Sequence, residues 1–273
     1  MIMEFAAALL EYRFLQLAIL ASLMASIACG MVGTFVVVKK MGYLAGGIAH
    51  AVLGGIGAAL FFGYPAMLGA LIAAVAAALI LGCVKLYWKE QEDVLVGALW
   101  AAGMAAGVLF IAKTPGYQID LMTYLFGNIL LVTPGQIWLM LGLNVCLVAV
   151  ILLYFKQFAA IAFDEEFARL RGLPVTALYL LLLCLIAVSV VLLVRIVGLI
   201  LVIALLTLPA AIAHHYVYNM AHMMVLSMLV TALICLSGLA LSYGPDLPAG
   251  ATIILVAATT YLASTLITKW RRG

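Results

Sequence analysis

Residues 174–194 read PVTALYLLLLCLIAVSVVLLV and contain no charged side chain. An α-helix needs about 20 apolar residues to cross the roughly 30 Å of hydrocarbon in a bilayer, so this run predicts a membrane-spanning helix. The 273-residue chain as a whole has the same character, with 69% hydrophobic and 8% charged residues. Soluble domains contain about 25% charged residues. The sequence therefore predicts an all-α polytopic membrane protein, with residues 1–273 forming a single transmembrane domain.

Similar apolar runs predict a bundle of about eight or nine spanning helices. They cover residues 14–38, 44–62, 65–87, 94–112, 135–155, 174–194, 196–213, 221–242 and 248–268. Another run, near residues 121–132, is too short to cross the bilayer and is flanked by Pro-Gly pairs. Irregular backbone at membrane depth is tolerated where protein or a water cavity surrounds it. We therefore expect a re-entrant or half-helix near residues 121–132.

The distribution of Lys and Arg predicts the orientation, because basic residues collect on the cytoplasmic side of a membrane. Threading the spans alternately, with Lys39 and Lys40 inside, places ten of the thirteen basic residues in the cytoplasm. The three left outside are Arg13, Lys113 and Arg195. The N-terminus is then expected outside and the C-terminus in the cytoplasm.

His50 is the clearest polar residue inside an apolar span. It lies in GGIAHAVLGGIG, residues 46–57, and is expected near mid-membrane. Polar groups at this depth often mark ion pathways, and neutral imidazole is a common ligand for Zn²⁺, Mn²⁺ and Fe²⁺. A lone imidazole can also simply bond a neighbouring helix carbonyl. The pattern leaves a metal ligand, a gate and a structural histidine open.

Two adjacent histidines, His214 and His215, are weaker metal candidates. They lie in a turn expected on the cytoplasmic side, which also contains His222. Residues 215 and 222 are seven apart and could share a helix face. The alternative is a set of solvated histidines at the membrane interface.

Pro209, in LLTLP at residues 205–209, lies inside a predicted helix whose apolar run is otherwise uninterrupted. Proline lacks an N–H group and clashes with the preceding turn, so the Leu205 carbonyl is freed. The expected result is a kink. The kink could act as a hinge or gate, or could be structural only.

The longest mixed-charge segment is DEEFARLRGLP, residues 164–174. Its acids come first and its bases follow, which suits a helix dipole, and Gly172 and Pro174 are stop signals. Phe163, Phe167 and Leu170 recur at helical spacing. The segment predicts a short amphipathic helix near residues 164–172 on the cytoplasmic face, with a solvated loop as the alternative.

Several common motifs are missing from the sequence. It contains neither a G-x-x-x-x-G-K-[ST] phosphate loop nor an H-E-x-x-H zinc motif, so ATP hydrolysis is not expected on this chain. The 5 cysteines are widely spaced without a C-x-x-C pair, which argues against a disulfide framework. A net charge of +3 is too small to favour nucleic acid as a partner.

Four segments together resemble the membrane permeases of the bacterial zinc/manganese/iron ABC importers, a family related to the vitamin B12 and siderophore importers. They are residues 46–57, 120–130, 164–172 and 197–211. The last segment contains Gly198 and Pro209, the two hinge or gate candidates. With the number of spans, the likeness covers nearly the whole chain.

The resemblance implies a permease homodimer in the bacterial inner membrane. Two separate cytoplasmic ABC ATPases would bind the ATP, and an extracytoplasmic metal-binding protein would deliver a divalent metal, zinc or manganese. Alternating access would then carry the metal inward, with no cofactor bound permanently. The residues that would couple the permease to the ATPases are Asp164, Glu165, Glu166, Ala168, Arg169 and Gly172.

His50 would correspond to the family's intramembrane histidine, a transient metal ligand. Family members commonly carry an Asp four residues earlier, where this chain has Gly46. The departure weakens a carboxylate–imidazole site. A self-contained secondary transporter or cation channel is the alternative function, but it would need ionisable residues at mid-membrane, and His50 alone is convincing. An intramembrane enzyme lacks a plausible catalytic set, so we predict a transport subunit rather than an enzyme.

Overall fold

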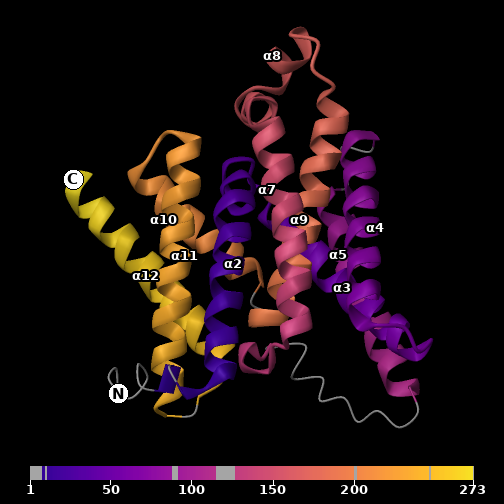
Figure 1. Ribbon diagram of the computed structural model, residues 1–273. Coiled ribbons are helices and arrows are strands. Elements are labelled where there is room, and N and C mark those ends of the chain that lie inside the picture. Colours follow the sequence, from indigo (N-terminus) through magenta and orange to yellow (C-terminus); the bar gives the residue numbers. More distant parts are fainter. Residues whose placement is uncertain are drawn as a thin grey trace. The chain divides into compact units, whose positions relative to one another are not determined.

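A computed structural model describes residues 8–9, 11–87, 92–114, 127–199, 202–245 and 247–272. These residues form helices and no strand (Figure 1). The helices are α2 (Arg13–Val38), α3 (Gly42–Phe61), α4 (Ala66–Tyr87), α5 (Glu92–Lys113), η1 (Ile129–Leu131), α7 (Pro134–Phe163), α8 (Glu165–Leu170), α9 (Val175–Val197), α10 (Val202–Tyr216), α11 (Met220–Tyr243) and α12 (Ala249–Arg272). Among them, 8 are long and apolar enough to cross a membrane. The predicted all-α polytopic fold is confirmed.

Three elements differ in detail from the prediction. Helix α7 runs to Phe163 instead of ending at residue 155, because Lys156 ends the apolar run without interrupting the helix. Helix α10 has 15 residues, and at about 1.5 Å per residue it is shorter than the hydrocarbon layer. Residues 121–126 lie outside the described part of the chain. The remainder of the half-helix predicted near 121–132 forms the single 3₁₀ turn η1, capped by the Asn128 side chain.

The helices group into two compact units. One unit comprises Met1–Val37, Met122–Ala149 and Leu192–Gly273, and the other comprises Val38–Leu121 and Val150–Val191. In the first, α10, α11 and α12 pack against one another. In the second, α3 packs along both α4 and α5. That the whole chain acts as one permease domain stays a prediction.

Large apolar side chains cover the outer faces of several helices. Leu153 of α7 is 74% exposed, Ile72 of α4 is 69% exposed and Leu255 of α12 is 68% exposed. Exposed apolar area of this extent would make a water-soluble protein aggregate. Hydrocarbon is the solvent that suits these faces, as the composition predicts.

Helix α5 approaches α3 closely at Gly103. A methyl group added there would lie 2.6 Å from the Ala51 Cα and 3.0 Å from the His50 carbonyl oxygen. Both neighbours are backbone atoms, so no side-chain rotation could make room. Small residues allow such close helix contacts in membranes, where lipid is as apolar as the helices themselves. Gly103 therefore fixes the distance between α5 and the segment of α3 that carries His50.

We predict that Gly103→Ala destabilises the protein by about 1–3 kcal/mol, because the added methyl group forces α5 away from α3. The matched control is Gly97→Ala on the same helix, where a methyl group meets no described atom within 4 Å. Thermal unfolding of the purified protein in detergent would measure both variants. Equal melting temperatures for the two would contradict the close-contact explanation.

Candidate functional site

His50 lies in the middle of α3 and is 5% exposed. Its ring stacks on the indole of Trp100 from α5, with 3.9 Å between ring centroids and 12° between planes. No described residue makes a hydrogen bond to His50 Nδ1, although that atom is buried. A buried polar atom without a partner is uncommon in native proteins. The alternative of a histidine bonded through Nδ1 to a neighbouring helix carbonyl is therefore not what the described residues show.

The stacking partner of His50 follows from the packing of α5. Trp100 and Gly103 are three residues apart and share a helix face, so the close contact at Gly103 also brings the indole against the imidazole. Trp100 is 37% exposed, so the described residues leave part of the indole uncovered. Trp100 is not among the candidate residues predicted from the sequence. The sequence does contain one signal for it: Trp100 lies three residues before Gly103 of the G-x-x-x-G pair, on the same helix face.

The chemistry available to a metal at this position is limited. An imidazole offers one ring nitrogen, whereas an indole N–H group donates and cannot act as a ligand. Position 46, one helical turn before His50, is a buried glycine. The described residues include no cluster of three or more His, Cys, Asp or Glu side chains that could hold a metal ion. Around His50 the described residues thus supply a single strong ligand and no complete coordination sphere.

The predicted amphipathic segment forms the short helix α8, which lies in the connection between α7 and α9 (Figure 1). Asp164 is its N-cap, and its carboxylate accepts a hydrogen bond of 2.9 Å from the Phe167 N–H. Glu165 and Glu166 occupy the first turn and Arg169 the last, as the helix dipole favours. The N-cap bond fixes where α8 begins, as the sequence pattern predicts.

Gly172 ends α8 in a left-handed conformation with φ of 77°. The Gly172 N–H donates to the Arg169 carbonyl at 3.0 Å, and the Leu173 N–H donates to the Ala168 carbonyl at 3.1 Å. This pair of bonds is a Schellman motif, which favours glycine because other residues are strained at positive φ. Caps at both ends give α8 a defined length of 6 residues.

The two faces of α8 have different surroundings. Ala168 is fully buried, whereas Phe167 is 50% and Leu170 is 88% exposed. Phe163, at the end of α7, is 70% exposed. The Arg171 guanidinium lies 4.9 Å from the centre of the Phe167 ring. The helix therefore presents an apolar and charged surface that nothing in the described chain covers.

The two hinge candidates occupy different kinds of position. Gly198 has φ of 79° and its N–H donates to the Val194 carbonyl at 3.0 Å, so it ends α9. Pro209 is buried inside α10. Gly33 of α2 packs against the same stretch of α10, because a methyl group on Gly33 would lie 2.2 Å from the Leu206 carbonyl oxygen. A role for either residue in gating stays a prediction.

The histidines after Pro209 are engaged differently from His50. His214 is exposed. His215 Nδ1 lies 3.3 Å from Ser264 Oγ of α12, and its ring stacks on Tyr261 at 5.9 Å. Ser264 Oγ in turn donates to the Tyr216 hydroxyl at 3.1 Å. These contacts give His215 a packing role between α10 and α12, and metal binding by His214 or His215 stays a prediction.

Comparison with known proteins gives a consistent result over nearly the whole chain. The ABC 3 transport family matches residues 11–268. An uncharacterised membrane protein of Synechocystis sp. is 46% identical, over 93% of this chain and 91% of its own. The manganese transport system membrane protein MntC of Halalkalibacterium halodurans is 32% identical, over 93% of this chain and 87% of its own.

A solved structure gives the same result. In PsaBC from Streptococcus pneumoniae in complex with Fab, one chain is 32% identical to this chain and superposes with a TM-score of 0.89. The similarity covers 97% of this chain and 95% of that chain. The predicted resemblance to ABC importer permeases is confirmed.

Proposed function

Since the chain belongs to the ABC 3 transport family and is a permease of an ABC importer, we propose that its cargo is a divalent transition metal, manganese or zinc, carried into a bacterial cell. Two copies of the chain form the pathway. Two separate ABC ATPases bind the cytoplasmic side, and an extracytoplasmic binding protein delivers the metal. ATP is hydrolysed on the ATPases, so this chain is a transport subunit and not an enzyme.

The observation that carries this proposal is helix α8. It is capped at both ends between two membrane-spanning helices, and it exposes Phe167 and Leu170. An ATPase can move membrane helices only through a rigid contact, and a short capped helix is such a contact. The chain itself has no phosphate-binding loop. Energy must therefore come from another subunit that binds α8.

Two observations support a metal ion as the cargo. The relative from Halalkalibacterium halodurans is named as a manganese transport protein, and His50 is a buried imidazole with an unpartnered ring nitrogen. Imidazole suits Zn²⁺ and Fe²⁺, and Mn²⁺ favours additional oxygen ligands. We propose that His50 from each of two copies binds the ion transiently, and that Gly198 and Pro209 permit the helix movements that open and close the pathway.

The direct test is uptake by the reconstituted complex. Proteoliposomes containing the permease are prepared with the ATPase and ATP in the lumen and the binding protein and manganese outside. They should accumulate manganese in the lumen. Competition with zinc and iron would rank the metals. Ion uptake by the purified chain alone, at the rate of the complete complex, would instead establish a self-contained transporter.

We predict that His50→Ala lowers metal uptake by roughly tenfold or more, the scale expected when a group that supports metal binding is lost, while the dimer and its ATPase still assemble. His222→Ala is the matched control, because His222 is exposed. Initial rates of uptake measure both variants. Unchanged uptake by His50→Ala would return this residue to a packing role.

We predict that Gly172→Pro uncouples ATP hydrolysis from transport, since proline requires φ near −65° and lacks the N–H that bonds to Arg169. Gly63→Pro is a matched control: Gly63 has φ of 76° and donates to the Leu60 carbonyl at 3.1 Å, but it lies between α3 and α4. Both variants bear the same backbone strain. Loss of metal-linked ATP turnover in Gly172→Pro alone supports the proposal, and normal turnover contradicts it.

We predict that α8 faces the cytoplasm. In a background in which the 5 native cysteines are replaced by alanine, a membrane-impermeant maleimide applied to intact cells should label Tyr64→Cys, in the turn before α4, and should spare Leu170→Cys. Inside-out vesicles should give the opposite pattern. Both positions are well exposed, at 66% for Tyr64 and 88% for Leu170, so access from the correct side determines the signal. Labelling of Leu170→Cys in intact cells would invert the topology and remove the ATPase-binding role of α8.

A further inference from the structure

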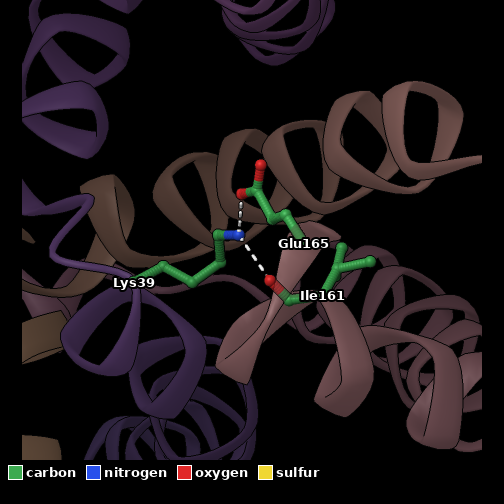
Figure 2. Close-up of polar contacts among 3 residues, drawn as sticks. All are labelled: Lys39, Ile161 and Glu165. Atoms are coloured by element: carbon green, nitrogen blue, oxygen red, sulfur yellow. Dashed lines mark hydrogen bonds and ion pairs between the residues drawn. The ribbon is translucent and has the colours of Figure 1, made fainter. Parts of the chain in front are cut away.

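Lys39 makes contacts that its role as a topology signal does not require. It lies in the turn before α3, and its side chain is only 8% exposed. Its Nζ donates to the Ile161 carbonyl of α7 at 2.8 Å and forms an ion pair with Glu165 of α8 (Figure 2). It also lies 5.7 Å from the centre of the Tyr179 ring of α9. One ammonium group thus contacts three successive helices.

The end of α7 creates the site that Lys39 fills. Asp164 has an extended conformation, so α7 ends at Phe163. The Ile161 carbonyl, near this end, therefore has no N–H of α7 four residues later to accept a hydrogen bond from. The last carbonyls of a helix need another donor, and a cation is favoured at the negative end of the helix dipole. Lys39 supplies both the donor and the charge. A stable position for its ammonium group follows from the geometry of α7.

The ion pair with Glu165 ties Lys39 to the first residue of α8. Exposed ion pairs contribute little to stability, and Glu165 is 49% exposed. The partner nevertheless lies on the helix to which the ATPase is proposed to bind. Any movement of α8 relative to α7 would stretch one of the two contacts made by Lys39 Nζ. The distance between Lys39 and Glu165 therefore depends on the position of α8 relative to α7.

Lys39 is also connected by a short piece of backbone to the helix that carries His50. Met41 is fully buried and its carbonyl accepts a hydrogen bond of 3.1 Å from Ala45 N–H, which joins the turn to α3. Lys40, the second residue of this turn, adopts a positive φ of 55°. Helix α3 then continues without interruption from Gly42 through His50 to Phe61. A rigid helix would transmit a displacement at Lys39 along its axis.

We propose that Lys39 is a positioning residue that transmits movement of α8 to α3, through its ion pair with Glu165 and its bond to Ile161. The inference rests on the proposed function, in which an ATPase moves α8 and His50 binds the ion. Lys39 contacts neither ATP nor the metal. Its function is to make α3, the helix that carries His50, move together with α8, the helix that the ATPase binds.

The test compares ATP hydrolysed per metal ion transported in the reconstituted complex. Glu165→Gln removes the charge pair while leaving the cap of α8 and the Lys39–Ile161 bond in place. Lys39→Met removes both contacts but keeps a long apolar side chain over Tyr179. Lys156→Met is the matched control, because Lys156 is an exposed lysine of α7.

We expect Glu165→Gln to raise ATP consumed per ion by roughly 2- to 30-fold, the range for residues that carry coupling between sites, with an unchanged melting temperature. The double variant should be no worse than Lys39→Met, because the two residues act through one contact. Coupling in Lys156→Met should equal that of the wild type. If Lys39→Met does not fold, Glu165→Gln alone decides the question.

Two outcomes would overturn the inference. One is an unchanged ATP-to-ion ratio in Glu165→Gln. The other is a lower ratio of ATPase to permease in the purified Glu165→Gln complex with normal coupling in the fraction that remains bound, which would make Glu165 a docking residue only. Failure of the wild-type complex to couple ATP to uptake would instead contradict the proposed function, so the two failures are distinguishable.

Discussion

Hydrocarbon excludes unpaired charge, and this constraint explains where the informative residues of the chain lie. A charged or polar side chain inside the bilayer is costly, so ammonium groups gather where helices end and where carbonyls or rings are available to receive them. Lys39 finds a carbonyl of α7 and the ring of Tyr179, and Lys85 lies 5.6 Å from the same ring. Exclusion of charge from hydrocarbon thus accounts for the position of these ammonium groups at helix ends. Lys39, which the sequence predicts at the membrane boundary, also contacts α7, α8 and α9 there.

The same constraint bears on His50, a polar side chain buried within a span. Buried hydroxyl groups such as those of Ser22 and Thr34 donate to the carbonyl four residues earlier in their own helix, whereas Ser227 Oγ, like His50 Nδ1, is buried without a hydrogen bond to the described residues. An imidazole is too large and rigid for that arrangement, and His50 Nδ1 has no hydrogen bond to the described residues. Its ring is held by stacking on Trp100 and by the close contact at Gly103. Packing therefore fixes the orientation of the imidazole, while its Nδ1 makes no hydrogen bond to the described residues.

The sequence predicts the helices well because their length and polarity are properties of single segments. Helix α8 was predictable in the same way, since Asp164 and Gly172 specify its two ends locally. The partner of Lys39 and the stacking of Trp100 on His50 were not, because they depend on how each helix is rotated about its axis and on which helices are neighbours. Small residues such as Gly103 indicate a close contact without naming the helix on the other side. Helix α7 continues beyond residue 155, where its predicted span ends, to Phe163. Polarity predicts where a helix leaves the membrane, whereas the helix itself ends only where the backbone changes conformation, here at Asp164.

In the proposed pathway each chain offers one imidazole at mid-membrane, that of His50, and this limit suits transport. Divalent transition metals take four to six ligands, so one His50 ring nitrogen cannot hold an ion tightly. In the proposed dimer, two such nitrogens would have to be completed by water or backbone carbonyl oxygens, and Gly46 provides no carboxylate to strengthen the site. An ion that must leave for the cytoplasm gains nothing from a tight site, because conduction requires binding weak enough to permit release. In the proposed mechanism, selectivity is then imposed before the ion reaches α3, by the protein proposed to deliver it. The direction of movement is imposed from the proposed cytoplasmic end, where Lys39 contacts α8 in the turn before α3.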